Sequence, residues 1–160
     1  MADEPVDLEL MNAAFRDFVP HNKALQLSLI SATWSPPQVT IKLPWSERLV
    51  GNPETQVLHG GAVTTLLDAC CGVSVYLKLK SPQPIATLDL RVDFLGRPPG
   101  HRDVFAKAEC YRATRSVAFV RASAWVDDEA EPFAAATATF ALSTQGRALT
   151  EEELRKGIAP

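Results

Sequence analysis

Residues 60–77 read GGAVTTLLDACCGVSVYL, a run that is almost continuously apolar and contains no proline. Its β-branched residues alone would permit a strand, but a run of this length favours a helix. A helix that is apolar on most of its sides has to be covered by other parts of the chain. The sequence therefore predicts a long central helix that the remaining elements wrap.

Strand-like runs lie on both sides of the predicted helix. Alternating apolar residues and turn formers place them at residues 25–33, 38–43, 85–94, 103–111, 116–126 and 132–142. Pro36-Pro37 marks the first turn, and hairpin-length connections join the later runs, which favours antiparallel pairing. In the third run, the alternation predicts one face made of Ala86, Leu88, Leu90, Val92 and Phe94. The expected fold class is α+β, with a curved antiparallel sheet wrapped around the long helix.

The two ends of the chain are expected to lie outside this domain. Over residues 7–19, apolar side chains recur at helical spacing, which predicts an amphipathic helix that Pro20 ends. The tail predicts a short helix over residues 150–156, because Thr150 can act as its cap. We therefore divide the chain into an N-terminal helix (1–19), a main domain (20–145) and a C-terminal tail (146–160).

Composition narrows the class of protein. The chain has 160 residues and a net charge of −3, which fits one globular domain and argues against a nucleic-acid partner. Cys70, Cys71 and Cys110 lack metal-ligand spacing, and we interpret them as small buried side chains in a reducing compartment. The sequence shows neither a signal peptide nor the ~20 apolar residues of a membrane span. We expect a cytoplasmic protein with no membrane partner, no metal and no cofactor.

Asp68 is the charged residue inside the predicted helix, between Leu67 and Ala69. A carboxylate in apolar surroundings is costly unless something compensates for its lost hydration. Such surroundings suit a general base or a nucleophile, and carboxylates of this kind gather at functional sites. The alternative is that Asp68 lies on a narrow solvent-facing strip of the helix or pairs with a basic residue.

His59, Gly60 and Gly61 stand where a long loop becomes the helix. Glycine lets a ligand approach the backbone, and the first amides of a helix are unpaired donors that can stabilise an oxyanion. The alternatives are a tight turn that merely needs glycine and a histidine with a structural role. Asp68 lies roughly 10 Å farther along the helix axis, so one carbonyl reaches both features easily only if a second subunit supplies the carboxylate.

The run from Leu58 to Ala69 resembles the signature of the PaaI-type hotdog thioesterases, which is His-Gly-Gly followed by a helical Asp nine residues after the His. The resemblance extends over residues 20–142 through the segments 20–25, 86–95, 115–120 and 135–140. It implies the hotdog fold and hydrolysis of an acyl-CoA thioester, with CoA entering only as part of the substrate. It also implies homodimers, which often pair into dimers of dimers, with sites at the dimer interface.

Residue roles follow from the resemblance by position. The Gly60 amide would polarise the thioester carbonyl, and His59 would order the loop and the thioester end. Asp68 of the other subunit would activate water or attack the carbonyl directly. Thr87 occupies the place of a Ser or Thr that positions the water in related enzymes. A monomeric variant should therefore fold poorly or be inactive.

Other substrate contacts are expected around this centre. The family's loop carries an Asn six residues before the His, where this chain has Pro53, and we assign that role to the neighbouring Asn52. Gln56 replaces a common glycine three residues before the His, and we place it at the substrate with Gly61. Arg112 and Arg115 flank a hairpin, where they either meet the CoA phosphates or belong to a solvated turn.

Two other functions remain open. A hotdog dehydratase or hydratase would need a different placement of His and acid, and the predicted helix contains no His. A non-catalytic acyl-CoA-binding module would keep the cleft without using Asp68. A serine hydrolase is disfavoured because no Gly-x-Ser-x-Gly elbow is present.

Overall fold

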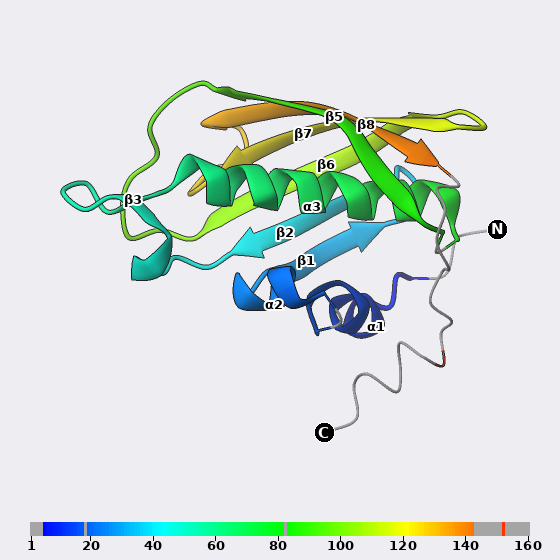
Figure 1. Ribbon diagram of the computed structural model, residues 1–160, viewed down its shortest axis with the longest axis horizontal. Coiled ribbons are helices and arrows are strands. Elements are labelled where there is room, and N and C mark those ends of the chain that lie inside the picture. Colours follow the sequence, from blue (N-terminus) through cyan, green and yellow to red (C-terminus); the bar gives the residue numbers. More distant parts are fainter. Residues whose placement is uncertain (1–4, 18, 82, 143–151, 153–160) are drawn as a thin grey trace.

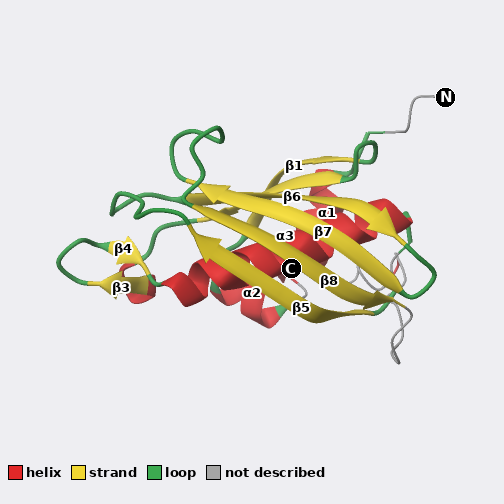
Figure 2. Cartoon of the chain, turned by 90° about the horizontal axis from the view of Figure 1, so that it is seen from above, coloured by secondary structure: helices red, strands yellow, loops and turns green. Residues whose placement is uncertain are grey.

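The chain is seen in a computed structural model, which describes residues 5–17, 19–81, 83–142 and 152. A long helix, α3 (Gly60–Leu79), lies along one face of a six-stranded antiparallel sheet (Figures 1 and 2). The strands follow the order β1 (Ser28–Thr33), β2 (Gln38–Leu43), β6 (Val104–Ala113), β7 (Val117–Trp125), β8 (Ala134–Leu142) and β5 (Ile85–Phe94). The predicted α+β class, with a sheet around a long central helix, is confirmed.

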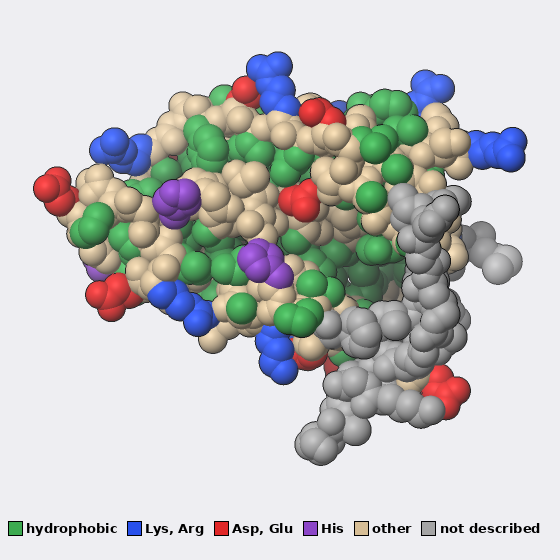
Figure 3. All heavy atoms as spheres, in the orientation of Figure 1, with side chains coloured by type: hydrophobic (Ala, Val, Ile, Leu, Met, Phe, Trp, Pro, Cys, Tyr) green, Lys and Arg blue, Asp and Glu red, His purple; other side chains and the backbone are tan. Residues whose placement is uncertain are grey.

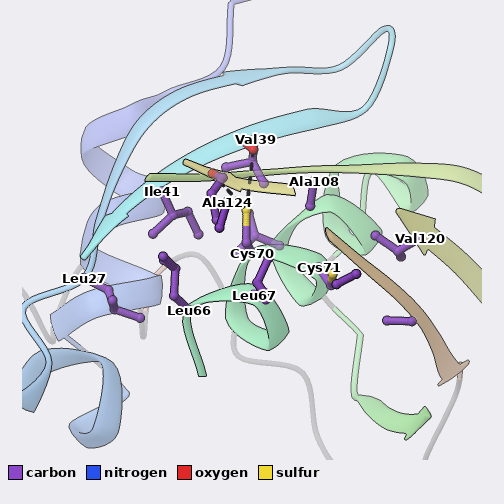
Figure 4. Packing of buried hydrophobic residues seen from close by; sticks show 14 of the residues in the cluster. Leu27, Val39, Ile41, Leu66, Leu67, Cys70, Cys71, Ala108, Val120 and Ala124 are labelled. Atoms are coloured by element: carbon purple, nitrogen blue, oxygen red, sulfur yellow. Dashed lines mark hydrogen bonds between the residues drawn. The ribbon is translucent and has the colours of Figure 1, made fainter. Parts of the chain in front are cut away.

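Small side chains let the helix lie close to the sheet. The buried face of the sheet is rich in alanine: Ala106, Ala108, Ala118, Ala124, Ala134, Ala136 and Ala138 are each 5% exposed or less. The helix fills the space above them with larger side chains, including Leu66 and Leu67, which are fully buried (Figure 4). Large residues on one layer facing small residues on the other give dense packing without voids.

The N-terminal segment differs from the predicted single helix. It consists of α1 (Leu8–Asn12), a π-helical turn (Ala13–Asp17) and a second short helix, α2 (Pro20–Ala24). Pro20 therefore begins a helix, because the first helical position needs no backbone N–H. The prediction that Pro20 ends a helix is wrong. The segment docks on β1 through Asn12, whose side chain accepts from the Leu29 amide at 2.8 Å and donates to the Leu29 carbonyl at 3.1 Å.

The strand boundaries agree with the sequence to within a few residues, and the largest shift is at the start of β1. The expected run began at residue 25, but Leu25 ends α2 and Gln26 adopts a left-handed conformation with φ 56°. β1 therefore starts at Ser28. The predicted tail helix lies outside the described residues, apart from Glu152.

A β-bulge in β5 changes the predicted face of that strand. Thr87 pairs with Phe140 and Asp89 pairs with Thr139, so Leu88 is the extra residue between them. Because of this insertion, Ile85 and Thr87 face the helix together with Leu90, Val92 and Phe94, whose partners on β8 are buried alanines. The prediction that Ala86 and Leu88 share this face is wrong, and Leu88 is 60% exposed.

The connection between β2 and α3 has structure of its own. It contains a 3-10 turn, η2 (Glu47–Leu49), and a small two-stranded sheet of β3 (Val50–Asn52) and β4 (Val57–Leu58). β4 leads directly into α3, so this small sheet determines where the helix begins (Figure 1).

One side of α3 is left uncovered by the rest of the described chain, which differs from the expected complete wrapping. The buried positions face the sheet, whereas Gly61 and Tyr76 are exposed and Asp68 is half-buried. In the space-filling view of this side, charged side chains lie mainly toward the rim (Figure 3). By length and hydropathy alone α3 would also pass for a membrane span, and half of its most apolar 18-residue stretch is buried inside the domain.

Candidate active site

The first turn of α3 is capped by a histidine. His59 has an extended backbone conformation, and its Nδ1 accepts a hydrogen bond of 2.9 Å from the Gly61 amide. Its carbonyl accepts from the amides of Ala62 at 2.9 Å and Val63 at 3.4 Å. Because Nδ1 accepts, the neutral imidazole carries its proton on Nε2, where it can serve as a donor. His59 is thus both the cap of the helix and an exposed polar group at its start.

Capping by His59 leaves one early amide available. Gly60 precedes the amides that His59 occupies, and within the described residues its N–H donates to no protein acceptor. The helix dipole and this unpaired donor favour partial negative charge at the same point. Gly60 is therefore the amide best placed to polarise a carbonyl, whereas the Gly61 amide is already engaged. The predicted substrate contact of Gly61 stays a prediction.

The two glycines have different neighbours. A Cβ on Gly61 would lie 2.9 Å from His59 Nδ1, so a side chain there would displace the capping ring. A Cβ on Gly60 would lie 3.3 Å from Cζ of Phe94, the last residue of β5. Phe94 is 51% exposed and lies beside the free amide. The alternation predicted one strand face that includes Phe94, but it did not connect Phe94 with the site.

Asp68 is half-buried on the open strip of α3, eight residues beyond Gly60. Its Oδ1 accepts a hydrogen bond of 2.9 Å from the Thr87 hydroxyl. In the single chain the Asp68 carboxylate is therefore only partly enclosed. The contact between Asp68 and Thr87 was not predicted, and it depends on the bulge at Leu88, which turns Thr87 toward the helix. The role of Thr87 in positioning the water stays a prediction.

Asn52 and Gln56 shape the hairpin before the helix. Asn52 Oδ1 accepts from the amides of Glu54 at 2.9 Å and Thr55 at 3.2 Å. Gln56 has a φ of 57°, and its side chain donates to the Pro53 carbonyl at 2.7 Å. Both side chains are thus engaged in the turn and make no contact with Asp68. Their predicted roles toward the substrate stay predictions.

Trp45 fixes the same hairpin to the body of the domain. Its indole N–H donates to the Gln56 carbonyl at 3.0 Å, and its backbone amide donates to Asp103 at 2.8 Å. The His101 amide donates to the same Gln56 carbonyl at 3.3 Å, and the Trp45 and His101 rings are 4.8 Å apart. The loop that leads to His59 is therefore held by hydrogen bonds from both Trp45 and His101.

Arg112 and Arg115 lie at the hairpin between β6 and β7, at the opposite end of the sheet from the small β3–β4 sheet (Figure 1). Both are exposed, and Arg112 lines a shallow cleft with Tyr111 and Phe119. The single chain does not bring them to Gly60. A contact with CoA phosphates would require the site of another subunit, and their role stays a prediction.

The cysteines are structural, as expected. Cys70 is fully buried, and its Sγ lies 3.5 Å from the Val39 carbonyl oxygen and 3.4 Å from that of Ala106 (Figure 4). Burial, followed by the nearby charge of Asp68, raises the pKa of Cys71 to about 12. Such thiols are not nucleophiles at neutral pH. Across residues 5–17, 19–81, 83–142 and 152, no cluster of three or more His, Cys, Asp or Glu side chains could hold a metal ion.

The capping interaction gives a stability prediction. His59→Ala removes the acceptor for the Gly61 amide and should lower the free energy of unfolding by about 1 kcal/mol, the usual value of a helix cap. His59→Asn keeps a capping oxygen and should recover most of that loss. Urea unfolding of the three proteins checks this. Equal stability of wild type and His59→Ala would contradict the capping role.

Comparison with known proteins agrees with this geometry. Residues 55–133, which include the cap, α3 and β5, match the thioesterase superfamily. The chain is 31% identical over 146 residues to a medium/long-chain acyl-CoA thioesterase, YigI, of Salmonella typhimurium. That alignment covers 83% of this chain and 92% of the relative.

Solved structures show the same fold. A crystal structure of a Pseudomonas aeruginosa protein is 39% identical, with a TM-score of 0.74 over 84% of this chain and 97% of that one. The phenylacetic acid degradation protein PaaI of Thermus thermophilus has the same fold at 20% identity, with a TM-score of 0.65 over 77% of this chain and 98% of its own. With its hotdog-type architecture and its relationship to these proteins, the chain belongs to the thioesterase superfamily.

Proposed function

We propose that the protein hydrolyses acyl-CoA thioesters to the free acid and CoA. The observation that carries this is the hydrogen-bonded pair of Asp68, on the open strip of α3, and Thr87, on β5. The same helix begins with the free Gly60 amide. A carboxylate base and an amide donor are the two groups that thioester hydrolysis requires. The relative named for medium- and long-chain acyl-CoA supports an acyl chain of that size.

The proposed reaction proceeds by attack of water. The Gly60 N–H binds the thioester oxygen and stabilises the negative charge that develops there. The Thr87 hydroxyl holds one oxygen of Asp68, and the carboxylate takes a proton from water as the water oxygen bonds to the carbonyl carbon. The C–S bond then breaks, and the proton on Asp68 passes to the leaving sulfur. His59 can donate Nε2–H at the thioester end.

We further propose that each site is shared between two copies of the chain. Gly60 and Asp68 are separated by eight residues of one helix, which corresponds to about 12 Å at 1.5 Å per residue. One reacting carbonyl therefore cannot contact both within a single chain. An antiparallel arrangement of two α3 helices would bring Gly60 of one copy to Asp68 of the other.

The surface beside the site supports such pairing. β5 is an edge strand of the sheet. Its residues Leu88 and Phe94, and Leu95 directly after it, are apolar and each more than half exposed. The uncovered strip of α3 adjoins β5 (Figure 1). Unpaired edges with exposed apolar residues are prone to pair with another chain. A homodimer through β5 and α3 would cover both, and two such dimers can pair further.

A non-catalytic acyl-CoA-binding module is the alternative. It would not need a hydroxyl held at 2.9 Å from a carboxylate on the open strip, and the Asp68–Thr87 pair therefore favours catalysis.

Replacement of the base tests the function. Asp68→Asn keeps the shape of the side chain but cannot accept a proton, so turnover should fall by roughly 100- to 10,000-fold. The measurement is thiol release from acyl-CoAs, with circular dichroism to confirm folding. Asp89→Asn is the matched control, because Asp89 lies on the outer face of β5. Unchanged turnover in Asp68→Asn would exclude this mechanism.

Replacement at the edge strand tests the pairing. Leu88→Arg places a charge in the proposed interface and should give a monomer with little thiol release. Ile30→Arg makes the same change on β1, the opposite edge, where the side chain is 47% exposed, and should leave the dimer intact. Light scattering after gel filtration measures the molar mass. A fully active Leu88→Arg monomer would refute the shared site.

A further inference from the structure

A groove runs along the first turns of α3, on the flank away from β5. It has a volume of about 390 Å³, within the usual range for ligand sites. α3 contributes Gly61, Ala62 and Thr65 to it, whereas Gly60 meets Phe94 on the β5 flank. The opposite walls come from α2, with His21 and Leu25, and from the segment Arg48–Val50. Their sequence pattern alone does not connect these wall residues with the site.

Hydrogen bonds join the walls of this groove to each other and to His59, the cap of α3. A guanidinium N–H of Arg48 donates to the Ala24 carbonyl and so joins the η2 wall to α2. The His59 amide donates to the Leu49 carbonyl at 2.8 Å, and Val50 pairs with Leu58 in the small sheet. His59 itself lines the groove. The groove is therefore a fixed extension of the site that begins at His59.

The lining indicates what the groove holds. Four aliphatic side chains line it: Leu25, Leu49, Val50 and Ala62. Its polar side chains are those of Thr65 and of His21, Arg48 and His59, and the last three are exposed. Among the described residues, no acidic side chain lines it. A flexible run of methylene groups gains most from such a lining, because burial of apolar surface is favourable along its whole length.

We infer that this groove receives the acyl chain of the substrate, and that Leu25 and Val50 limit the chain length. The inference rests on the proposed thioester hydrolysis. The thioester carbonyl lies at the Gly60 amide, and the acyl carbon chain runs past His59 between α2 and β3. The N-terminal segment, which precedes the sheet, thus contributes to the specificity for acyl-chain length. The CoA arm leaves the carbonyl in the other direction, along the β5 flank.

Chain-length profiles test this inference. In the wild type, kcat/KM should rise with each added methylene by up to about fourfold until the groove is filled. Leu25→Trp and Val50→Trp fill the groove from opposite walls, and each should lower the ratio of long-chain to short-chain kcat/KM by roughly tenfold, the loss of about two methylene contacts. Lys23→Trp is the matched control, because Lys23 is exposed on α2 and lies outside the groove.

The possible results separate the inference from the proposed function. A selective loss of long-chain activity in both variants, with the wild-type profile in Lys23→Trp, supports the inference. If both variants keep the wild-type profile, the acyl chain lies elsewhere and the inference is wrong. If both lose activity equally at all lengths and bind free CoA more weakly, the groove holds the CoA arm, and the inference is again wrong. If the wild type releases no thiol from any acyl-CoA, the proposed function itself fails.

Discussion

The packing of α3 on an alanine-lined sheet is the constraint from which the other features follow. Because side chains such as Ala108 and Ala138 are small, the helix can lie close to the strands and bury Leu66 and Leu67 completely. Because one side of the helix packs against the sheet, the residues that lie on its opposite side are determined as well. Gly60 and Asp68 then lie on a strip that the sheet does not cover. The residues of the proposed reaction therefore occupy the part of the helix that the fold leaves open.

Two local features of the structure, the His59 cap and the bulge at Leu88, orient the functional groups on that strip. The cap from His59 to the Gly61 amide occupies the later amides of the first turn and leaves that of Gly60 available. The bulge at Leu88 brings Thr87 onto the helix-facing side of β5, where its hydroxyl reaches Asp68. Without the bulge, Thr87 would face away from the helix, because side chains alternate along a strand. Bulges commonly re-aim side chains next to active sites in this way.

Much of the fold could be predicted from the sequence, because period and length carry that information. The long apolar run predicted α3, and the alternation of apolar residues predicted the strands of the six-stranded sheet. The bulge could not be predicted, since Leu88 continues a regular alternation and the irregularity appears only in the pairing with β8. The role of Pro20 was misjudged because a proline is equally compatible with the end of one helix and the first turn of the next.

The candidate site was predictable only in part. His59, Gly60 and Asp68 belong to a local motif and could be named from their spacing. Phe94, Leu25 and Val50 adjoin the same centre only through tertiary packing, and a hydrophobic residue carries no sign of whether it lines a core or a groove. The solvent-facing position of Asp68 likewise depends on which side of α3 the sheet covers. Neighbouring residue types alone suggested an enclosed carboxylate.

The central claim is that one catalytic site combines Gly60 of one copy with Asp68 of another. Gly60→Pro removes the amide donor, because the first helical position tolerates proline and His59 has a compatible extended conformation. Gly60→Ala brings the same Cβ toward Phe94 but keeps the N–H, and it is the matched control. Gly60→Pro and Asp68→Asn should each be inactive alone.

Complementation by mixed dimers tests this claim most directly. When the two variants are refolded together, random pairing gives mixed dimers with one intact site, and the account predicts about a quarter of wild-type thiol release. A mixture no more active than the separate variants, with mixed dimers shown to form, would contradict the account.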